Sequence, residues 1–299
     1  MRRLTVAAAV ALTAVPAAAH EGHSHAIGWT LDLGVTLPLA IALLLYLAGL
    51  ARLRQRSKGG RPQLRTRAIR YLAGWAILAG ALVSPLHEAG EVSFTFHMIE
   101  HELIMLPAAL LLVAARPGPV LLWGLPQAVR SALGPLIRFG LWRSLGSPYV
   151  ATALQAVAIV AWHMPALFDR ALDSEGWHIA QHLSFLVTAL AFWWAMLARR
   201  GDAAGNFISA ICLFVTSMIG GGVGALMALD ASPWYSAYVA LGMTPFGLSP
   251  AEDQQLAGVI MWVPGGLFHL AAAMVFLARA LRSAPERLDP SVARGGEAA

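Results

Sequence analysis

Seven apolar segments separated by short polar stretches constrain this chain more than any other feature of its sequence. They cover residues 29–51, 68–86, 94–115, 149–168, 177–198, 206–229 and 254–278. A helix needs about 20 residues to cross a bilayer, and each segment is near that length. Only 12% of the 299 residues are charged, whereas soluble domains carry about 25%. The pattern predicts an all-α integral membrane protein, with seven transmembrane helices in a membrane domain at 29–282 and the lipid bilayer as its surroundings.

The first 19 residues have the pattern of a secretory signal peptide. Two arginines precede the apolar run 4–15, and small residues ending at Ala19 fit the cleavage rule. An uncleaved anchor is the alternative, although this run is short for a membrane span. Cleavage after Ala19 would leave an extracytoplasmic tail at 20–28 that attracts metal ions or is simply polar. The histidines of this tail are His20, His23 and His25.

The positive charges predict how the chain crosses the membrane. With the mature N-terminus outside, four segments are predicted to be cytoplasmic: the loops 52–67, 116–148 and 199–205, and a C-terminal tail at 283–299. Nineteen of the 21 Lys and Arg residues follow the signal segment, and only Arg170 of these would face outward. Cytoplasmic loops are rich in Lys and Arg, so orientation explains the net charge of +5 and no nucleic-acid partner is expected. We interpret 116–148 as an interfacial amphipathic stretch.

Five of the ten histidines are predicted to gather in one layer near the outer surface. Two pairs have i, i+4 spacing, which puts both rings of a pair on one helical face. A fifth histidine ends the fourth apolar segment. At about 1.5 Å per residue, the three segments bring all five rings to depths of about 2–10 Å. The five are His97, His101, His163, His178 and His182.

This layer of histidines predicts a metal site. Imidazole is the commonest protein ligand for transition metals, and the nearby thioethers of Met98 and Met164 favour copper as Cu(I). Glu100 could orient a ligating ring or supply an oxygen. Zinc suits the same donors, and haem b suits His101 and His182 as axial ligands. A scaffold without metal is a further alternative. Because protons compete with metal for imidazole, copper binding should weaken below about pH 6.5.

Three other residues have more ordinary interpretations. His87 is expected in a loop, with membership of the metal site as the alternative. His269 is expected to be structural or to line the bundle, and Glu252 is expected to complete a capping box. The single cysteine, Cys212, excludes an internal disulfide and a thiolate cluster. No nucleophile with a paired base is visible, so the sequence does not predict an enzyme.

Several motifs resemble the polytopic CtaG-type cytochrome c oxidase assembly factors, over residues 70 to 278. They are His97 to Leu103 (HMIEHEL), Trp162 to Phe168 (WHMPALF), Trp177 to Phe185 (WHIAQHLSF), Leu248 to Gly258 (LSPAEDQQLAG) and Met261 to Gly266 (MWVPGG). The resemblance implies a multi-pass protein of the bacterial plasma (inner) membrane that serves the maturation of a haem-copper oxidase. A haem-copper oxidase subunit is then the expected partner. A role as a copper chaperone, receiving the ion from a periplasmic copper carrier, is also expected. The five histidines of the predicted layer match the family's histidines.

Overall fold

The computed structural model describes residues 27–56, 60–137, 146–198 and 203–283, and this part of the chain contains helices and loops but no strand. The elements are α1 Leu33–Arg56, α2 Arg61–Val83, α3 Pro85–Val92, α4 Phe94–Leu103, η1 Ile104–Ala108, α5 Ala109–Ala114, α6 Gly118–Gly124, α7 Gln127–Ile137, α9 Pro148–Trp162, α10 Pro165–Asp173, α11 Glu175–Ala198, α12 Ala203–Leu229, α13 Ser236–Leu241, α14 Pro250–Ile260, η2 Met261–Gly265 and α15 Gly266–Ser283. The expected signal peptide, the tail histidines His20, His23 and His25, and residues 284–299 lie outside the described residues.

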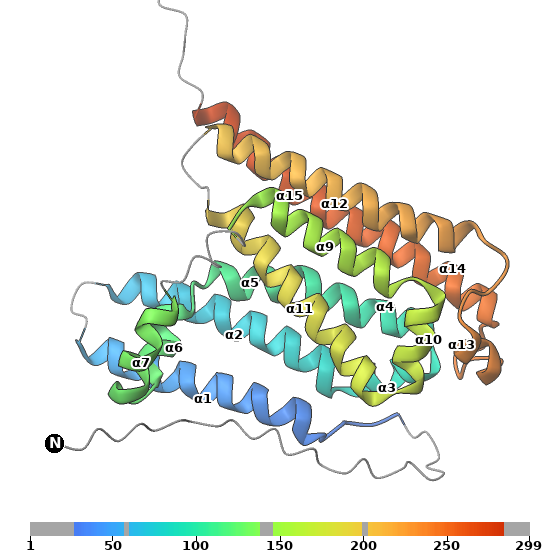
Figure 1. Ribbon diagram of the computed structural model, residues 1–299, viewed down its shortest axis with the longest axis horizontal. Coiled ribbons are helices and arrows are strands. Elements are labelled where there is room, and N and C mark those ends of the chain that lie inside the picture. Colours follow the sequence, from blue (N-terminus) through green and yellow to red (C-terminus); the bar gives the residue numbers. More distant parts are fainter. Residues whose placement is uncertain (1–26, 57–59, 138–145, 199–202, 284–299) are drawn as a thin grey trace, which may run out of the picture.

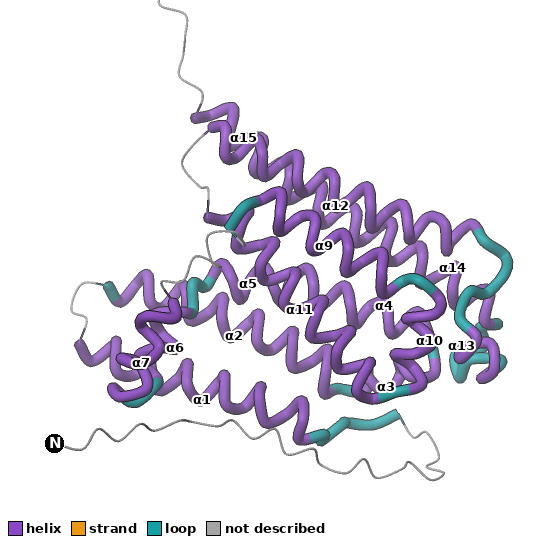
Figure 2. The backbone as a smooth tube through the Cα atoms, in the orientation of Figure 1, coloured by secondary structure: helices purple, strands orange, loops and turns teal. Residues whose placement is uncertain are grey.

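The long helices lie side by side along one common direction (Figure 1). α1 forms one edge of the bundle, and α12 with α15 forms the opposite edge. The short helices α3, α10 and α13 gather at one end, and α6 and α7 lie at the other (Figure 2). α11 packs against α9 and α5, and α4 packs against α3 and α14. The bundle therefore has two distinct ends, and the end with α3, α10 and α13 receives the beginning of α4.

Five helices are long and apolar enough to cross a membrane, and up to seven if each of two bent pairs is one span. These apolar helices indicate a multi-pass membrane protein. The expected seven segments match this upper count. Two of the expected segments are bent rather than continuous: in the fourth, 149–168, α9 and α10 meet at 74°, and at the end of the second α2 and α3 meet at 43°. In both pairs a proline begins the second helix, and the residue before proline favours an extended backbone.

Two spans contain a π-helical turn near their middle. The span Phe94–Ala114 widens at η1, which contains Pro107, and the span Pro250–Ser283 widens at η2, which contains Pro264. Proline has no N–H to donate and its ring collides with the preceding turn, so the helix accommodates it by a local change of winding. The sequence analysis did not foresee either turn.

Small residues bring helices into close contact. α12 is continuous, and a Cβ at Gly224 would lie 2.7 Å from the carbonyl oxygen of Gly258 on α14. Gly49 of α1 and Gly124 of α6 likewise leave no room for a Cβ. The stretch 116–148, which was expected to be interfacial, includes two helices, α6 and α7. Of these, α6 packs on α1. The expected capping box of Ser249 and Glu252 is confirmed at the start of α14.

Candidate metal centre

The start of α4 is held by a carboxylate from another helix. Asp253 of α14 accepts hydrogen bonds from the Ser93 hydroxyl at 2.8 Å, from the Phe94 N–H at 2.6 Å and from the Thr95 N–H at 3.1 Å. The first N–H groups of a helix have no partner within it, so this buried carboxylate serves as the cap of α4. α14 thereby fixes the position of the first turn of α4, from which His97 projects.

Three imidazoles from two helices meet beside this turn. His97 of α4 and His178 and His182 of α11 each offer a ring nitrogen, and the three nitrogens lie within 4.8 Å of one another. Nitrogens bound to one ion at about 2 Å lie no more than about 4 Å apart, so small side-chain movements would bring all three to a single ion. His97 is buried, whereas His178 and His182 are partly buried.

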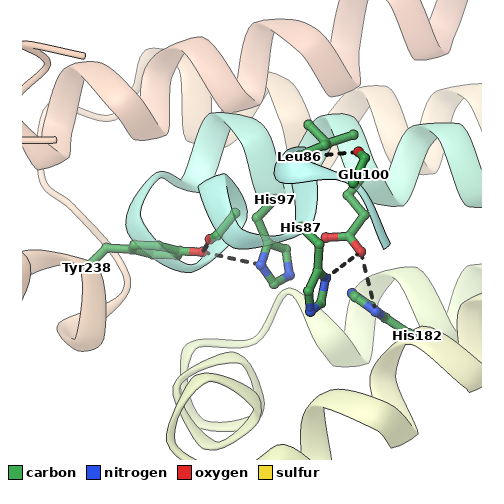
Figure 3. A network of polar contacts seen from close by, with 8 residues as sticks. Leu86, His87, His97, Glu100, His182 and Tyr238 are labelled. Carbon is green, nitrogen blue, oxygen red and sulfur yellow. Dashed lines mark hydrogen bonds and ion pairs between the residues drawn. The ribbon is translucent and has the colours of Figure 1, made fainter. Parts of the chain in front are cut away.

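A carboxylate joins this cluster from the same face of α4. Oε1 of Glu100 lies 2.9 Å from Nδ1 of His87 and 3.7 Å from Nδ1 of His182 (Figure 3). These three residues form a second group whose donor atoms lie within 4.8 Å of one another. A carboxylate on one ring nitrogen fixes the tautomer and orients the other nitrogen toward a metal. Glu100 therefore hydrogen-bonds and orients the ring of His87, and its charge lies close to His182 without a hydrogen bond to it.

His87 was expected in a loop, and that prediction was wrong. It lies in α3, which begins at Ser84 and Pro85 and turns the ring toward Glu100. Proline at the first helical position after a serine is a helix-start signal, the same one that was used for Ser249 and Pro250. The sequence therefore contained the information needed to place His87 on a helix.

Within and around the cluster, many buried ring nitrogens lack a hydrogen-bond partner in the described part of the chain. They are Nε2 of His97, His101, His163, His178 and His182, together with Nδ1 of His101. A buried polar atom without a partner is costly, and nearly all such atoms in folded proteins are paired. An ion shared between rings would satisfy several of these nitrogens at once. Chemically, the arrangement can bind a metal through neutral imidazoles.

The remaining predicted ligands lie farther from the three converging rings. The His101 ring centroid is 4.3 Å from that of His97 and 5.0 Å from that of His182, so it lines the inner edge of the cluster. His163 caps the end of α9, where its Nδ1 lies 2.7 Å from the Ile159 carbonyl oxygen. Phe168 and Phe185 each contact the His163 ring as well as a histidine of the cluster. His163 belongs to neither donor group.

The two predicted thioether ligands are not brought together with the cluster. Met98 is buried in the hydrophobic core, and Met164, at the bend before α10, is 53% exposed. Met98 follows His97 directly, so on a helix its side chain points about 100° away from the imidazole. Of the predicted donors other than histidine, only Glu100 lies among the converging rings.

The structure adds Tyr238 of α13, which lies beside His97 (Figure 3). Its hydroxyl is 2.6 Å from the Gly90 carbonyl oxygen and 3.2 Å from Nδ1 of His97. Burial holds the pKa of the Tyr238 hydroxyl well above its ordinary value, so the group keeps its proton. A carbonyl can only accept, so the hydroxyl donates to Gly90 and must accept from Nδ1–H of His97. This tautomer leaves the lone pair of His97 on Nε2, facing the cluster.

No local sequence signal pointed to Tyr238. The residue is 141 positions from His97, in a loop that the sequence predicted only as a connection between spans. Asp253, which is 158 positions from Thr95, was missed for the same reason. Both contacts arise only when α13 and α14 fold back over the start of α4.

Comparisons with known proteins agree with this architecture. The family model of the cytochrome c oxidase caa3 assembly factor (Caa3_CtaG) matches residues 44–283. Two mycobacterial proteins, uncharacterized protein Mb0105 of Mycobacterium bovis and uncharacterized protein MT0111 of Mycobacterium tuberculosis, are each 27% identical in an alignment of 264 residues that covers 84% of this chain. The chain spans only 38% of the length of either relative. No solved structure gives a significant match.

The family match covers most of the described helices and includes every residue of the histidine cluster. It also includes the helices that hold the cluster in place, from α2 to α15. The chain belongs to the family of cytochrome c oxidase caa3 assembly factors.

Proposed function

We propose that this assembly factor binds copper as Cu(I) at His97, His178 and His182 and supplies it to a haem-copper oxidase subunit during assembly. One observation carries the proposal: three imidazoles from two helices converge within 4.8 Å, and their buried Nε2 atoms lack partners among the described residues. Membership of the family implies an interaction with the oxidase. Binding and delivery of an ion require no chemical turnover.

The donor set is compatible with copper. Imidazole ligands suit copper, and the cluster offers three of them. Glu100 contributes a negative charge beside His182, where it would partly offset the positive charge of the ion. Zinc would accept the same imidazoles, so the test below measures both metals.

We further propose that the cluster faces the outside of a bacterial plasma membrane. Seven spans with an external mature N-terminus would bring the ends of α3, α10 and α13 to the outer surface, in agreement with the positive-inside rule. The tail histidines His20, His23 and His25 could then capture copper, from a periplasmic copper carrier or from solution, and pass it to the cluster. The cluster would pass it on to the oxidase subunit.

Metal quantification tests the proposal directly. The full chain, extracted in mild detergent and loaded with Cu(I), should carry copper, and His182→Ala should lose one ion per chain. Met98→Leu is the matched control, because it preserves volume in the core and should keep all copper. Equal copper in all three proteins would exclude the cluster as the copper site, and no copper in any of them would support a metal-free scaffold. Zinc found in place of copper would identify a zinc site, and the absorption spectrum of haem b would identify a haem site.

A further inference from the structure

A second group of potential ligands lies deeper in the bundle. A small cavity of about 20 Å³ lies where α4, η1, α9, α12, η2 and α15 meet. This volume holds one water molecule or one ion and nothing larger. Five side chains that can bind an ion line the cavity: Glu102, Met105, Gln155, Met261 and His269.

Two oxygens at this cavity are buried and have no hydrogen-bond partner among the described residues. They are Oε2 of Glu102 and Oε1 of Gln155. The amide nitrogen of Gln155 donates to Sδ of Met105 at 3.3 Å, so its oxygen is directed elsewhere. An ionisable side chain inside a membrane span is expensive and marks a functional site by default. A bound cation would pair with the carboxylate and with the amide oxygen.

His269 lines the same cavity. Its Nδ1 lies 2.9 Å from the Gly265 carbonyl oxygen. Because a carbonyl can only accept, Nδ1 carries the proton and Nε2 retains a lone pair. Gly265 also contacts Glu102, since a Cβ built on this glycine would lie 2.5 Å from Oε2. The carboxylate and the imidazole therefore approach each other across one glycine.

Two thioethers complete the set. Met105 and Met261 are each only 4% exposed, and both line the cavity. Trp193 ties Met105 to His269: its indole N–H donates to the Met105 carbonyl oxygen at 2.9 Å, while its ring lies parallel to the imidazole at 6.2 Å. Both methionines belong to the π-helical turns, and such turns are frequent at functional sites.

We infer that this cavity is a second Cu(I) site, with Met105, Met261 and His269 as ligands and Glu102 as counter-charge. Thioether and imidazole donors favour Cu(I) over Zn²⁺ and over hard cations. One carboxylate neutralises one monovalent ion, which limits the cost of charge in the membrane interior. His101 and Glu102 are adjacent on α4, so this helix connects the histidine cluster with the deeper site. The inference rests on the proposed handling of copper, but it uses none of the three ligands of the cluster.

Stoichiometry and ligand type test this inference together. The full chain in mild detergent is titrated with Cu(I) alone under anaerobic conditions, and X-ray absorption measures sulfur in the copper coordination shell. Wild type should bind two ions per chain and show sulfur ligation. The double variant Met105→Leu and Met261→Leu should bind one ion and lose the sulfur signal. Met274→Leu is the matched control on the same span, because this side chain is 56% exposed and should change neither readout.

Two further variants separate this inference from the proposed function. Gly265→Ala forces the Glu102 carboxylate away from the cavity without removing a donor, so it should lower the deeper site's Cu(I) affinity at least tenfold. His182→Ala should lose the other ion and keep the sulfur signal. If the double methionine variant binds as much copper as wild type with unchanged sulfur ligation, the second site is refuted while the cluster stands. If His182→Ala binds as much copper as wild type while the double methionine variant loses one ion, the cluster is refuted and the second site stands.

Discussion

The hydroxyl of Tyr238 determines which nitrogen of His97 is available to an ion. It accepts from Nδ1–H because its own proton is donated to the Gly90 carbonyl oxygen, at 2.6 Å. In the Tyr238→Phe variant the imidazole would be free to change tautomer or rotate. Loss of such a supporting partner typically costs 10–100-fold in metal affinity.

We therefore expect Tyr238→Phe to bind copper at the cluster about 10–100-fold more weakly, with little change in thermal stability. Competition with a Cu(I) chelator measures the affinity. Tyr71→Phe is the control, because that hydroxyl donates to the Ala42 carbonyl oxygen, away from the cluster. Unchanged affinity in Tyr238→Phe would show that this hydroxyl does not orient His97.

A second single residue, Asp253, is expected to matter for stability and binding together. Asp253→Ala removes three hydrogen bonds at the start of α4 and leaves two N–H groups buried without a partner. The expected loss is about 2–4 kcal/mol, since hydrogen bonds to charged groups are worth about 1.5–3 kcal/mol each and do not add fully. Thermal unfolding in detergent and copper content should both fall.

Glu252→Gln provides the comparison for Asp253→Ala. Glu252 caps α14 at an exposed position, so its variant should lose at most about 1 kcal/mol and keep its copper. Equal stability of the two variants would contradict a special role for Asp253 in fixing α4.

Which site residues could be predicted depends on how local their signals are. Two histidine pairs are recognisable because i, i+4 spacing is a local signal: His97 with His101, and His178 with His182. The depth of each residue in its span, calculated from the helical rise, then predicts that the two pairs lie at the same level. Tyr238 and Asp253 act across more than 140 positions, and only the folded chain brings them to α4. The thioethers Met98 and Met164 were selected for proximity in sequence, which does not determine the direction of a side chain.

At the scale of helices, the packing of α12 on α14 depends on two glycines. A Cβ at Gly258 would lie 2.5 Å from the backbone of α12, and one at Gly224 would lie 2.7 Å from the backbone of α14. Backbone atoms cannot move aside as a flexible side chain can. Close contact between membrane helices commonly depends on such small residues.

Gly258→Ala should therefore force the two helices apart and destabilise the protein by about 1–3 kcal/mol. Gly222→Ala is a closely matched control, because it lies on α12 with nothing within 4 Å of its Cβ position. That variant should be neutral or more stable by up to about 1 kcal/mol, since alanine is the better helix former. Thermal unfolding in detergent compares the two, and equal unfolding temperatures would contradict this view of the contact.

The helical nature of the spans was predictable, and the seven expected segments match the upper count of spans, whereas the bends were not foreseen. Apolar length identifies a span without regard to its shape, so it gave no information about bends in 68–86 and 149–168. Pro85 and Pro165 lie at the breaks, and each could have been used as a signal for the second helix of its pair. The π-helical turns at Pro107 and Pro264 depend on packing around them and have no comparable local signature.

For the whole molecule, the distribution of charge makes a prediction about orientation. In a background of Cys212→Ser, a membrane-impermeant thiol reagent should label Glu175→Cys in intact cells, because the turn between α10 and α11 is proposed to face outward. Ser131→Cys on α7 should be labelled only after the membrane is opened. Both positions are exposed in the structure. The reverse labelling pattern would invert the proposed topology.

The shape of the bundle explains how one membrane protein could hold an ion near its surface. Short helices α3, α10 and α13 close one end over the cluster, while the long spans supply the ligands from beneath (Figure 1). The ion would be surrounded by neutral rings, with one carboxylate to balance its charge. Delivery then requires only that the partner approach this end.

The most direct measurement is the location of copper in the loaded protein, from anomalous scattering at the copper absorption edge of a crystal of the full chain. The account predicts a peak between His97, His178 and His182, about 2 Å from a nitrogen of at least two of them. A copper-loaded crystal with no peak among these rings would contradict it.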